Sequence, residues 1–172
     1  MNYSGTYFEL EGRPAVRLVR HFSHSVDRVW AAIINPEESR HWFPSTLVIE
    51  PRVGGVARFS DDPNTPDSTG TVLSYEPPRR IEFTWGADEV HIQLESGDDD
   101  GCTLTLTNVL EAADTAARNS TGWTVCLLEL DKFLAGTPTT GPHGADAAPF
   151  EPIYQEFVRA GVPSGAPIPP TD

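Results

Sequence analysis

The feature that most constrains the fold is the stretch Asn119–Ala135, NSTGWTVCLLELDKFLA, which has the pattern of one amphipathic helix. Its apolar residues Trp123, Leu127, Leu130 and Leu134 recur at intervals of three and four, so they share one face. Polar residues at its start can cap it, and a glycine and a proline follow its end. Because nearly everything before this helix has the pattern of strands, we expect a sheet to cover its apolar face, which gives an α+β fold.

The residues before this helix predict a short helical section and a series of strands. Val26–Ile34 has apolar residues at helical spacing, and Asn35 followed by Pro36 marks the start of a second short helix. Short turns between the strands favour an antiparallel sheet. Alternating apolar and polar residues predict the strands at 15–22, 47–50, 56–60, 71–76, 80–85, 90–95 and 102–108.

Both ends of the chain differ from this middle part. Residues 1–14 mix polar and aromatic residues, and we expect them to form a loosely attached arm. From residue 137 to residue 172 the composition shifts to proline, glycine, alanine and threonine, which is typical of a linker. Within this tail, residues 150–160 can form a short helix with an apolar patch. The sequence therefore predicts one domain over residues 15–136.

Charge and cysteine content exclude several kinds of function. The chain of 172 residues has a formal net charge of −13, which repels phosphate backbones and anionic lipid, so we expect neither nucleic acid nor membrane as a partner. No stretch reaches the roughly 18 apolar residues of a membrane span, and the first residues lack a signal-peptide pattern, so we expect a cytoplasmic protein. Cys102 and Cys126 lie in apolar segments and are expected to be reduced core residues.

The histidine and acidic residues lack the spacing of a metal site or a catalytic motif. His21, His24, His41, His91 and His143 are scattered, and the aspartate runs do not have the calcium-loop pattern. Neither cysteine belongs to a Cys/His motif, and the sequence has no GxSxG. We therefore expect no metal and no cofactor, and the sequence identifies no catalytic residue.

Short motifs between Ala15 and Ala135 occur in a characteristic order. They are Val29-Trp30, Asn35-Pro36-Glu37, Trp42-Phe43, Val53-Gly54-Gly55, Gly70-Thr71-Val72, Pro77-Pro78-Arg79-Arg80-Ile81, Phe83-Thr84-Trp85 and Gly122-Trp123. In this order they resemble the START-like helix-grip superfamily and, within it, the family of activator-of-heat-shock-protein-90-ATPase homologues. The resemblance implies a seven-stranded antiparallel sheet curved around the long C-terminal helix, with two short helices after the first strand and a cavity between sheet and helix.

If this cavity exists, its lining can be predicted from the alternation along the strands. The expected apolar lining is Trp42, Phe43, Val72, Phe83, Trp85, Ile92, Leu104, Leu106, Trp123 and Leu127. The polar residues expected to meet a ligand are Arg58, His91 and Asn108. For each of these three a simpler interpretation exists, in which Arg58 pairs with an acidic residue, His91 is exposed, and Asn108 caps a strand end.

The most favoured function is binding of a small apolar or amphipathic molecule by a monomer or homodimer. One alternative is a module of co-chaperone type that binds a protein partner. Another is an enzyme of cyclase or hydrolase type, for which His91 and His41 are the available acid–base groups. An enclosed apolar cavity favours the binder, a filled interior with an exposed apolar patch favours the partner module, and buried polar pairs favour the enzyme.

Overall fold

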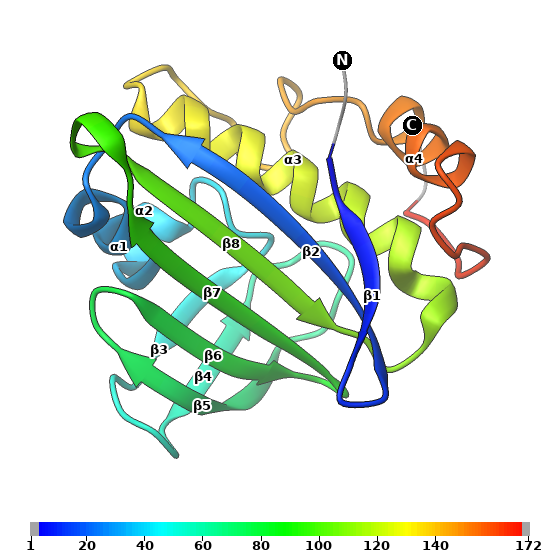
Figure 1. Ribbon diagram of the computed structural model, residues 1–172, viewed down its shortest axis with the longest axis horizontal. Coiled ribbons are helices and arrows are strands. Elements are labelled where there is room, and N and C mark those ends of the chain that lie inside the picture. The colour runs from blue at the N-terminus through cyan, green and yellow to red at the C-terminus, as the bar shows by residue number, and fades with distance from the viewer. Residues whose placement is uncertain (1–3, 170–172) are drawn as a thin grey trace.

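The computed structural model describes residues 4–169, which form an eight-stranded antiparallel sheet with helices on one side (Figure 1). The order of the strands is β1-β2-β8-β7-β6-β5-β4-β3, so the last strand, β8, returns to pair with β2. The strands are β1 (Thr6–Leu10), β2 (Arg13–Phe22), β3 (Thr46–Ile49), β4 (Val56–Ser60), β5 (Ser68–Glu76), β6 (Arg80–Trp85), β7 (Asp88–Ser96) and β8 (Cys102–Val109).

The N-terminal residues, predicted as a loose arm, supply the eighth strand. β1 pairs with β2, which begins at Arg13 rather than at Ala15. Glu11 and Gly12 join the two strands with φ angles of 52° and 81°, and positive φ at both central residues is typical of a tight hairpin turn. The expected seven strands are therefore one too few, because Glu-Gly is not the Asn-Gly or Asp-Gly pair by which such a turn is usually predicted.

Two short helices follow β2, as predicted. α1 (Val26–Ile34) begins where the Ser25 hydroxyl accepts a hydrogen bond from the backbone N–H of Arg28 at 3.2 Å. α2 (Pro36–Ser39) begins where the Asn35 side chain accepts one from the backbone N–H of Glu37 at 3.0 Å. The buried face of α1 adds to the core beside the sheet.

The long helix begins earlier than predicted. α3 spans Ala116–Leu134, and a short 3-10 turn at Ala113–Thr115 lies directly before it. Another short 3-10 turn, Asp98–Asp100, joins β7 to β8. The predicted caps at residues 119–121 lie inside the helix, where the Thr121 hydroxyl donates to the carbonyl of Ala117 at 2.7 Å. The backbone N–H of Ala117 donates instead to the carbonyl of Pro163 at 2.9 Å, so the tail satisfies a group at the helix start.

The C-terminal residues fold back onto α3. α4 (Phe150–Arg159) buries Ile153 and Phe157 against Ala117 and Val125 of α3, which forms a second, smaller apolar cluster. In Figure 1 α4 lies beside α3, away from the sheet. The tail therefore covers the side of α3 that the sheet does not reach.

The two faces of the sheet have different surroundings. The inner face packs on α1 and α3 and carries the main core, whereas in the view of Figure 1 β1 and β2 pass in front of α3 and no helix lies before the sheet. Side chains alternate between the faces, so β7 directs Val90, Ile92 and Leu94 inward and Glu89 and His91 outward. The outer face is open.

Candidate functional site

An aromatic cluster fills the inner face where a cavity was expected. Phe43 lies 5.6 Å from both Trp85 and Trp123, measured between ring centroids, and Trp85 lies 5.6 Å from Trp123. Phe59 stacks on Trp85 at 5.4 Å with only 14° between the ring planes. These separations are those of rings in contact, so the aromatic residues pack on one another.

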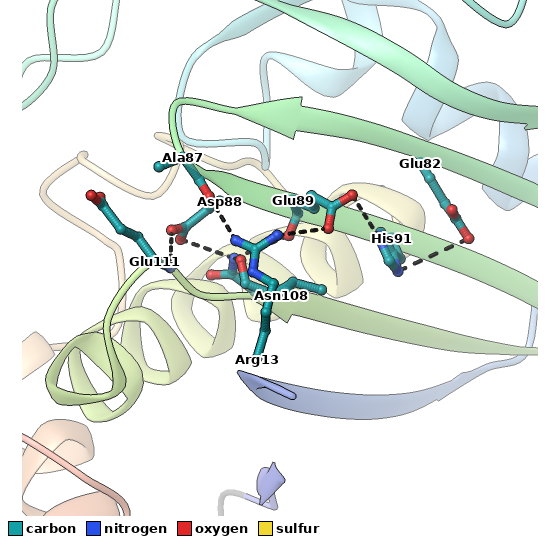
Figure 2. A network of polar contacts seen from close by, with 9 residues as sticks. Arg13, Glu82, Ala87, Asp88, Glu89, His91, Asn108 and Glu111 are labelled. Carbon is teal, nitrogen blue, oxygen red and sulfur yellow. Dashed lines mark hydrogen bonds and ion pairs between the residues drawn. The ribbon is translucent and has the colours of Figure 1, made fainter. Parts of the chain in front are cut away.

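Trp123 finds its polar partner within the protein. Its indole N–H donates to the side-chain oxygen of Asn108 at 3.1 Å, and the amide of Asn119 donates to the same oxygen at 3.0 Å. The Asn108 amide in turn donates to Asp88 at 3.1 Å and to the carbonyl of Glu89, also at 3.1 Å (Figure 2). Asn108 is 2% exposed, so this network joins β7, β8 and α3 inside the protein.

The structure places most of the predicted lining residues on the inner face. Trp85 is half-buried and the other members of this set are buried: Trp42, Phe43, Val72, Phe83, Ile92, Leu104, Leu106, Asn108, Trp123 and Leu127. Arg58 and His91 lie on the outer face instead. His91 and Ile92 are consecutive on a strand, so they point to opposite faces and cannot line one cavity. His41, the other histidine considered, stacks on Phe133 at 4.9 Å.

A hollow lies at the edge of the aromatic cluster, between the start of β3 and the loop that follows β4. Its walls include Ser45, Phe59, Asp62 and Trp85. It has a volume of about 0 Å³, so it does not admit a water molecule. Ser45 is 5% exposed, and its hydroxyl has no hydrogen-bond partner among the residues described. The hollow therefore combines an apolar wall with an unpaired hydroxyl.

Residues 137–147, which we call the strap, run close to this hollow after leaving α3. The Thr139 hydroxyl donates to the carbonyl of His41 at 3.4 Å, and the ring nitrogen Nε2 of His143 lies 2.8 Å from the carbonyl oxygen of Pro44. The same nitrogen lies 3.8 Å from Asp62. The strap is thus attached on both sides of Ser45, to the chain segment before it and to the loop after β4.

A buried carboxylate on α3 lies close to the strap. Glu129 is fully buried, and the Lys132 ammonium donates to its Oε1 at 2.8 Å and to the strap carbonyl of Asp146 at 2.9 Å. Its Oε2 has no partner within residues 4–169. Burial, followed by the negative charges of Asp62 and Glu129, raises the pKa of the Cys126 thiol, so both carboxylates lie near this cysteine. Cys102 and Cys126 are both buried and free.

A second polar region occupies the outer face. Arg13 donates to Glu89 at 3.1 Å and to the carbonyl of Ala87 at 2.8 Å (Figure 2). The two ring nitrogens of His91 lie 3.9 Å from Glu82 and from Glu89, one on each side. A hollow with a volume of about 550 Å³, which is the size of a small-molecule site, is bordered by Arg13, Glu82, Glu89 and His91.

Sequence reasoning missed several residues of these regions. Ser45 and Glu129 are of interest because the Ser45 hydroxyl and Oε2 of Glu129 are buried without a hydrogen-bond partner in the described residues. No sequence pattern indicates this property. Arg17 could have been found, because it alternates with inward Val16 and Leu18 on a predicted strand. No cluster of three or more His, Cys, Asp or Glu side chains suited to a metal ion occurs between residues 4 and 169.

Comparison with known proteins places the chain in a known fold. The model of the family described as Activator of Hsp90 ATPase homolog 1-like protein matches residues 23–135. No curated protein matches the sequence significantly. Within the described part of the chain, no helix has the length and apolar character needed to cross a membrane.

Several solved structures share the fold over nearly the whole chain. EF2215 from Enterococcus faecalis, described as a conserved protein of unknown function, is 21% identical with a TM-score of 0.72, over 91% of this chain and 89% of that chain. The crystal structure of CalU16 from Micromonospora echinospora is 22% identical with a TM-score of 0.69, over 92% and 95%. BPP1335 from Bordetella parapertussis is 21% identical with a TM-score of 0.64, over 92% and 90%. The shared fold therefore extends beyond residues 23–135.

Proposed function

The chain belongs to the family of Activator of Hsp90 ATPase homolog 1-like proteins, and from this premise we propose that it binds a small amphipathic molecule at the edge of the inner aromatic cluster. The fold of this family is consistent with ligand binding or with a role like that of a co-chaperone. The observation that carries the proposal is the buried hydroxyl of Ser45, which lacks a partner and belongs to a residue that lines a hollow beside Phe59 and Trp85. An apolar surface with one polar group to fix orientation is typical of small-molecule sites.

The unpaired hydroxyl gives a reason for a ligand to bind there. A buried polar group without a hydrogen bond costs about 1–3 kcal/mol, and a ligand atom that pairs with Ser45 recovers part of this cost. The stacked rings of Phe59 and Trp85 offer apolar area to the rest of the ligand. The ligand is therefore expected to be largely apolar and to carry a hydrogen-bonding group.

Binding requires the hollow to widen, because its present volume is about 0 Å³. The loop between β4 and β5 is the part best able to move, since it is largely exposed and Asp61 adopts a positive φ of 64°. The contact of Asp62 with His143 couples this loop to the strap. We therefore expect the loop and the strap to move away together, while Trp123 and Asn108 stay in place.

The proposal is tested by titrating the protein with the neutral fluorescent probe N-phenyl-1-naphthylamine. Saturable binding of one probe per chain is expected, and Ser45→Leu, which fills the hollow and removes the hydroxyl, should weaken it about tenfold. Val53→Leu, which enlarges an apolar side chain at an exposed turn residue, is the control and should change nothing. Thermal melts establish that both variants fold. Absence of saturable binding, or equal binding by the Ser45→Leu protein, would contradict the proposal.

The closed interior supports a second candidate, a protein-binding module. Val48, Val53 and Leu73 are large apolar residues with 44%, 64% and 38% exposure, and they come from β3, the turn after it and β5. The name of the family suggests the partner to test, an Hsp90 chaperone. If this candidate holds, the protein raises the ATPase rate of Hsp90, and Val48→Ser with Val53→Ser abolishes the increase. An unchanged ATPase rate would remove this candidate.

A further inference from the structure

Four side chains form a row across the open outer face of the sheet. Arg17 on β2 lies opposite Thr107 on β8, Thr107 opposite His91 on β7, and His91 opposite Glu82 on β6. Neighbouring strands lie about 4.8 Å apart, so the row spans roughly 14 Å between its end Cα atoms. Cation, hydroxyl, imidazole and carboxylate thus follow one another across the 550 Å³ hollow described above.

Among the three arginines that line this hollow, Arg17 differs from Arg13 and Arg80 because it forms no ion pair with the described residues. Arg13 pairs with Glu89 at 3.1 Å, and Arg80 pairs with Glu76 at 3.4 Å and with Glu82 at 4.0 Å. Arg17 has no carboxylate within 4.0 Å in the described residues, and its guanidinium lies over the ring of Phe8, 4.3 Å from the centroid. The ring orients the guanidinium without neutralising its charge.

His91 is the second group without a partner. Its Nε2 is buried and makes no hydrogen bond among residues 4–169. The carboxylates of Glu82 and Glu89 lie 3.9 Å from the ring nitrogens, which is beyond hydrogen-bond distance, although they flank the ring on both sides. The imidazole is therefore positioned by its neighbours, and its buried Nε2 becomes available to an atom in the hollow when the Glu89 side chain turns aside.

We propose that this outer hollow binds a small organic carboxylate, with the carboxylate on Arg17 and a second polar group on His91. The apolar part of such a molecule finds the accessible side chains of Leu10 and Leu73 at the border of the hollow. The chain as a whole has a net charge of −13 and repels anions, so an unpaired arginine inside a hollow marks the place where an anion is accepted. This site is separate from the inner one, because the sheet lies between them.

The test is a fluorine NMR titration with 4-fluorobenzoate, compared with its neutral relative 4-fluorobenzamide. Saturable binding of the carboxylate is expected, with the amide at least about tenfold weaker, because a charge-assisted hydrogen bond is lost. Arg17→Gln should weaken binding of the carboxylate about tenfold, and His91→Leu should weaken it about fivefold. Backbone amide shifts should centre on Thr107 and His91.

The matched control is Arg52→Gln, which removes an exposed arginine that pairs with Glu50 outside the hollow, and it should leave binding unchanged. The proposal is overturned if 4-fluorobenzoate, octanoate and succinate all fail to bind saturably, if Arg17→Gln has no effect, or if the shifts centre on Phe59 and Trp85.

Sedimentation velocity gives one more test. A dimer that Arg17→Gln dissociates would show that the row is an interface between copies of the chain, and would also overturn the proposal. Binding of the neutral naphthylamine probe beside Ser45 is a separate measurement, so the two proposals can fail independently.

Discussion

The inner and outer faces of the sheet use the same strands in opposite ways. On β7, Ile92 is buried in the core, whereas His91, one residue before it, lies in an open polar hollow. The hollow beside the inner cluster has a volume of about 0 Å³, and the outer one has about 550 Å³. The inner face, where the family resemblance implies a cavity, is therefore closed. The outer face, which faces solvent, has a hollow that is already open.

The two faces therefore differ in how a ligand would bind. A ligand on the inner face must displace protein, so its affinity is reduced by the cost of opening the loop after β4. A ligand on the outer face meets groups that are already positioned. Substitutions on the inner face should therefore act first on stability, and those on the outer face should act first on binding.

The largest effect is expected at Trp123. It is 4% exposed, contacts Phe43 and Trp85, and donates to Asn108, so Trp123→Ala should lower the free energy of unfolding by about 4–5 kcal/mol. Trp123→Phe keeps a ring and loses the indole N–H, and should cost about 1–2 kcal/mol. Urea unfolding measures both. A loss below about 1 kcal/mol in the alanine variant would show that the residue lines empty space and that the inner face is less closed than described.

A somewhat smaller effect is expected at Phe157 on α4. This ring is 2% exposed in the cluster that covers α3 from the side opposite the sheet, so Phe157→Ala should cost about 3 kcal/mol. Tyr154→Ala, on the same helix but half-buried, is the control and should cost about 1 kcal/mol. The thermal melting of both variants gives the result. If Phe157→Ala leaves the melting temperature unchanged, the tail is dispensable, as its linker-like composition suggested.

An intermediate effect is expected at Asn108, the polar residue of the inner face. Asn108→Ala leaves the Trp123 indole N–H and the Asn119 amide without their common acceptor, so about 2 kcal/mol of stability should be lost. Asn119→Ala removes one donor and keeps Asn108 paired with Trp123, and should cost less. Unfolding in urea again gives the values. Equal costs for the two variants would show that Asn108 does not hold the network together.

The sequence predicted the elements of the inner face well, because periodicity reports burial directly. α1 was expected at Val26–Ile34 and is found there, and the spacing of Trp123, Leu127 and Leu130 identified the face that α3 turns to the sheet. Family motifs then supplied the topology. Strand alternation also contains the information that His91 and Ile92 lie on opposite faces, although the predicted cavity lining included both.

Other features depend on contacts between distant parts of the chain, which one sequence does not reveal. The start of α3 was misplaced because a carbonyl of the tail, at Pro163, replaces a side-chain cap. The N-terminal strand was missed because its turn lacks the common Asn-Gly pair. The unpaired atoms of Ser45 and His91 depend on how the surrounding side chains pack. Predictions of function from this sequence therefore stop at the family and the fold.

The smallest effect on stability is expected for the outer row of Arg17, Thr107, His91 and Glu82. Arg17 is exposed and makes no ion pair with the described residues, so Arg17→Gln should change the free energy of unfolding by less than about 0.5 kcal/mol. His91→Gln should behave similarly, because the flanking carboxylates lie 3.9 Å from the ring nitrogens, which is beyond hydrogen-bond distance. The matched reference is Ile92→Ala, one residue further along β7, which should cost at least about 2 kcal/mol. Chemical unfolding of the three variants under identical conditions measures the difference between the faces. If His91→Gln destabilises the protein as much as Ile92→Ala, the outer row contributes to stability like a core residue. That result would contradict the proposal that its unpaired groups form a binding site.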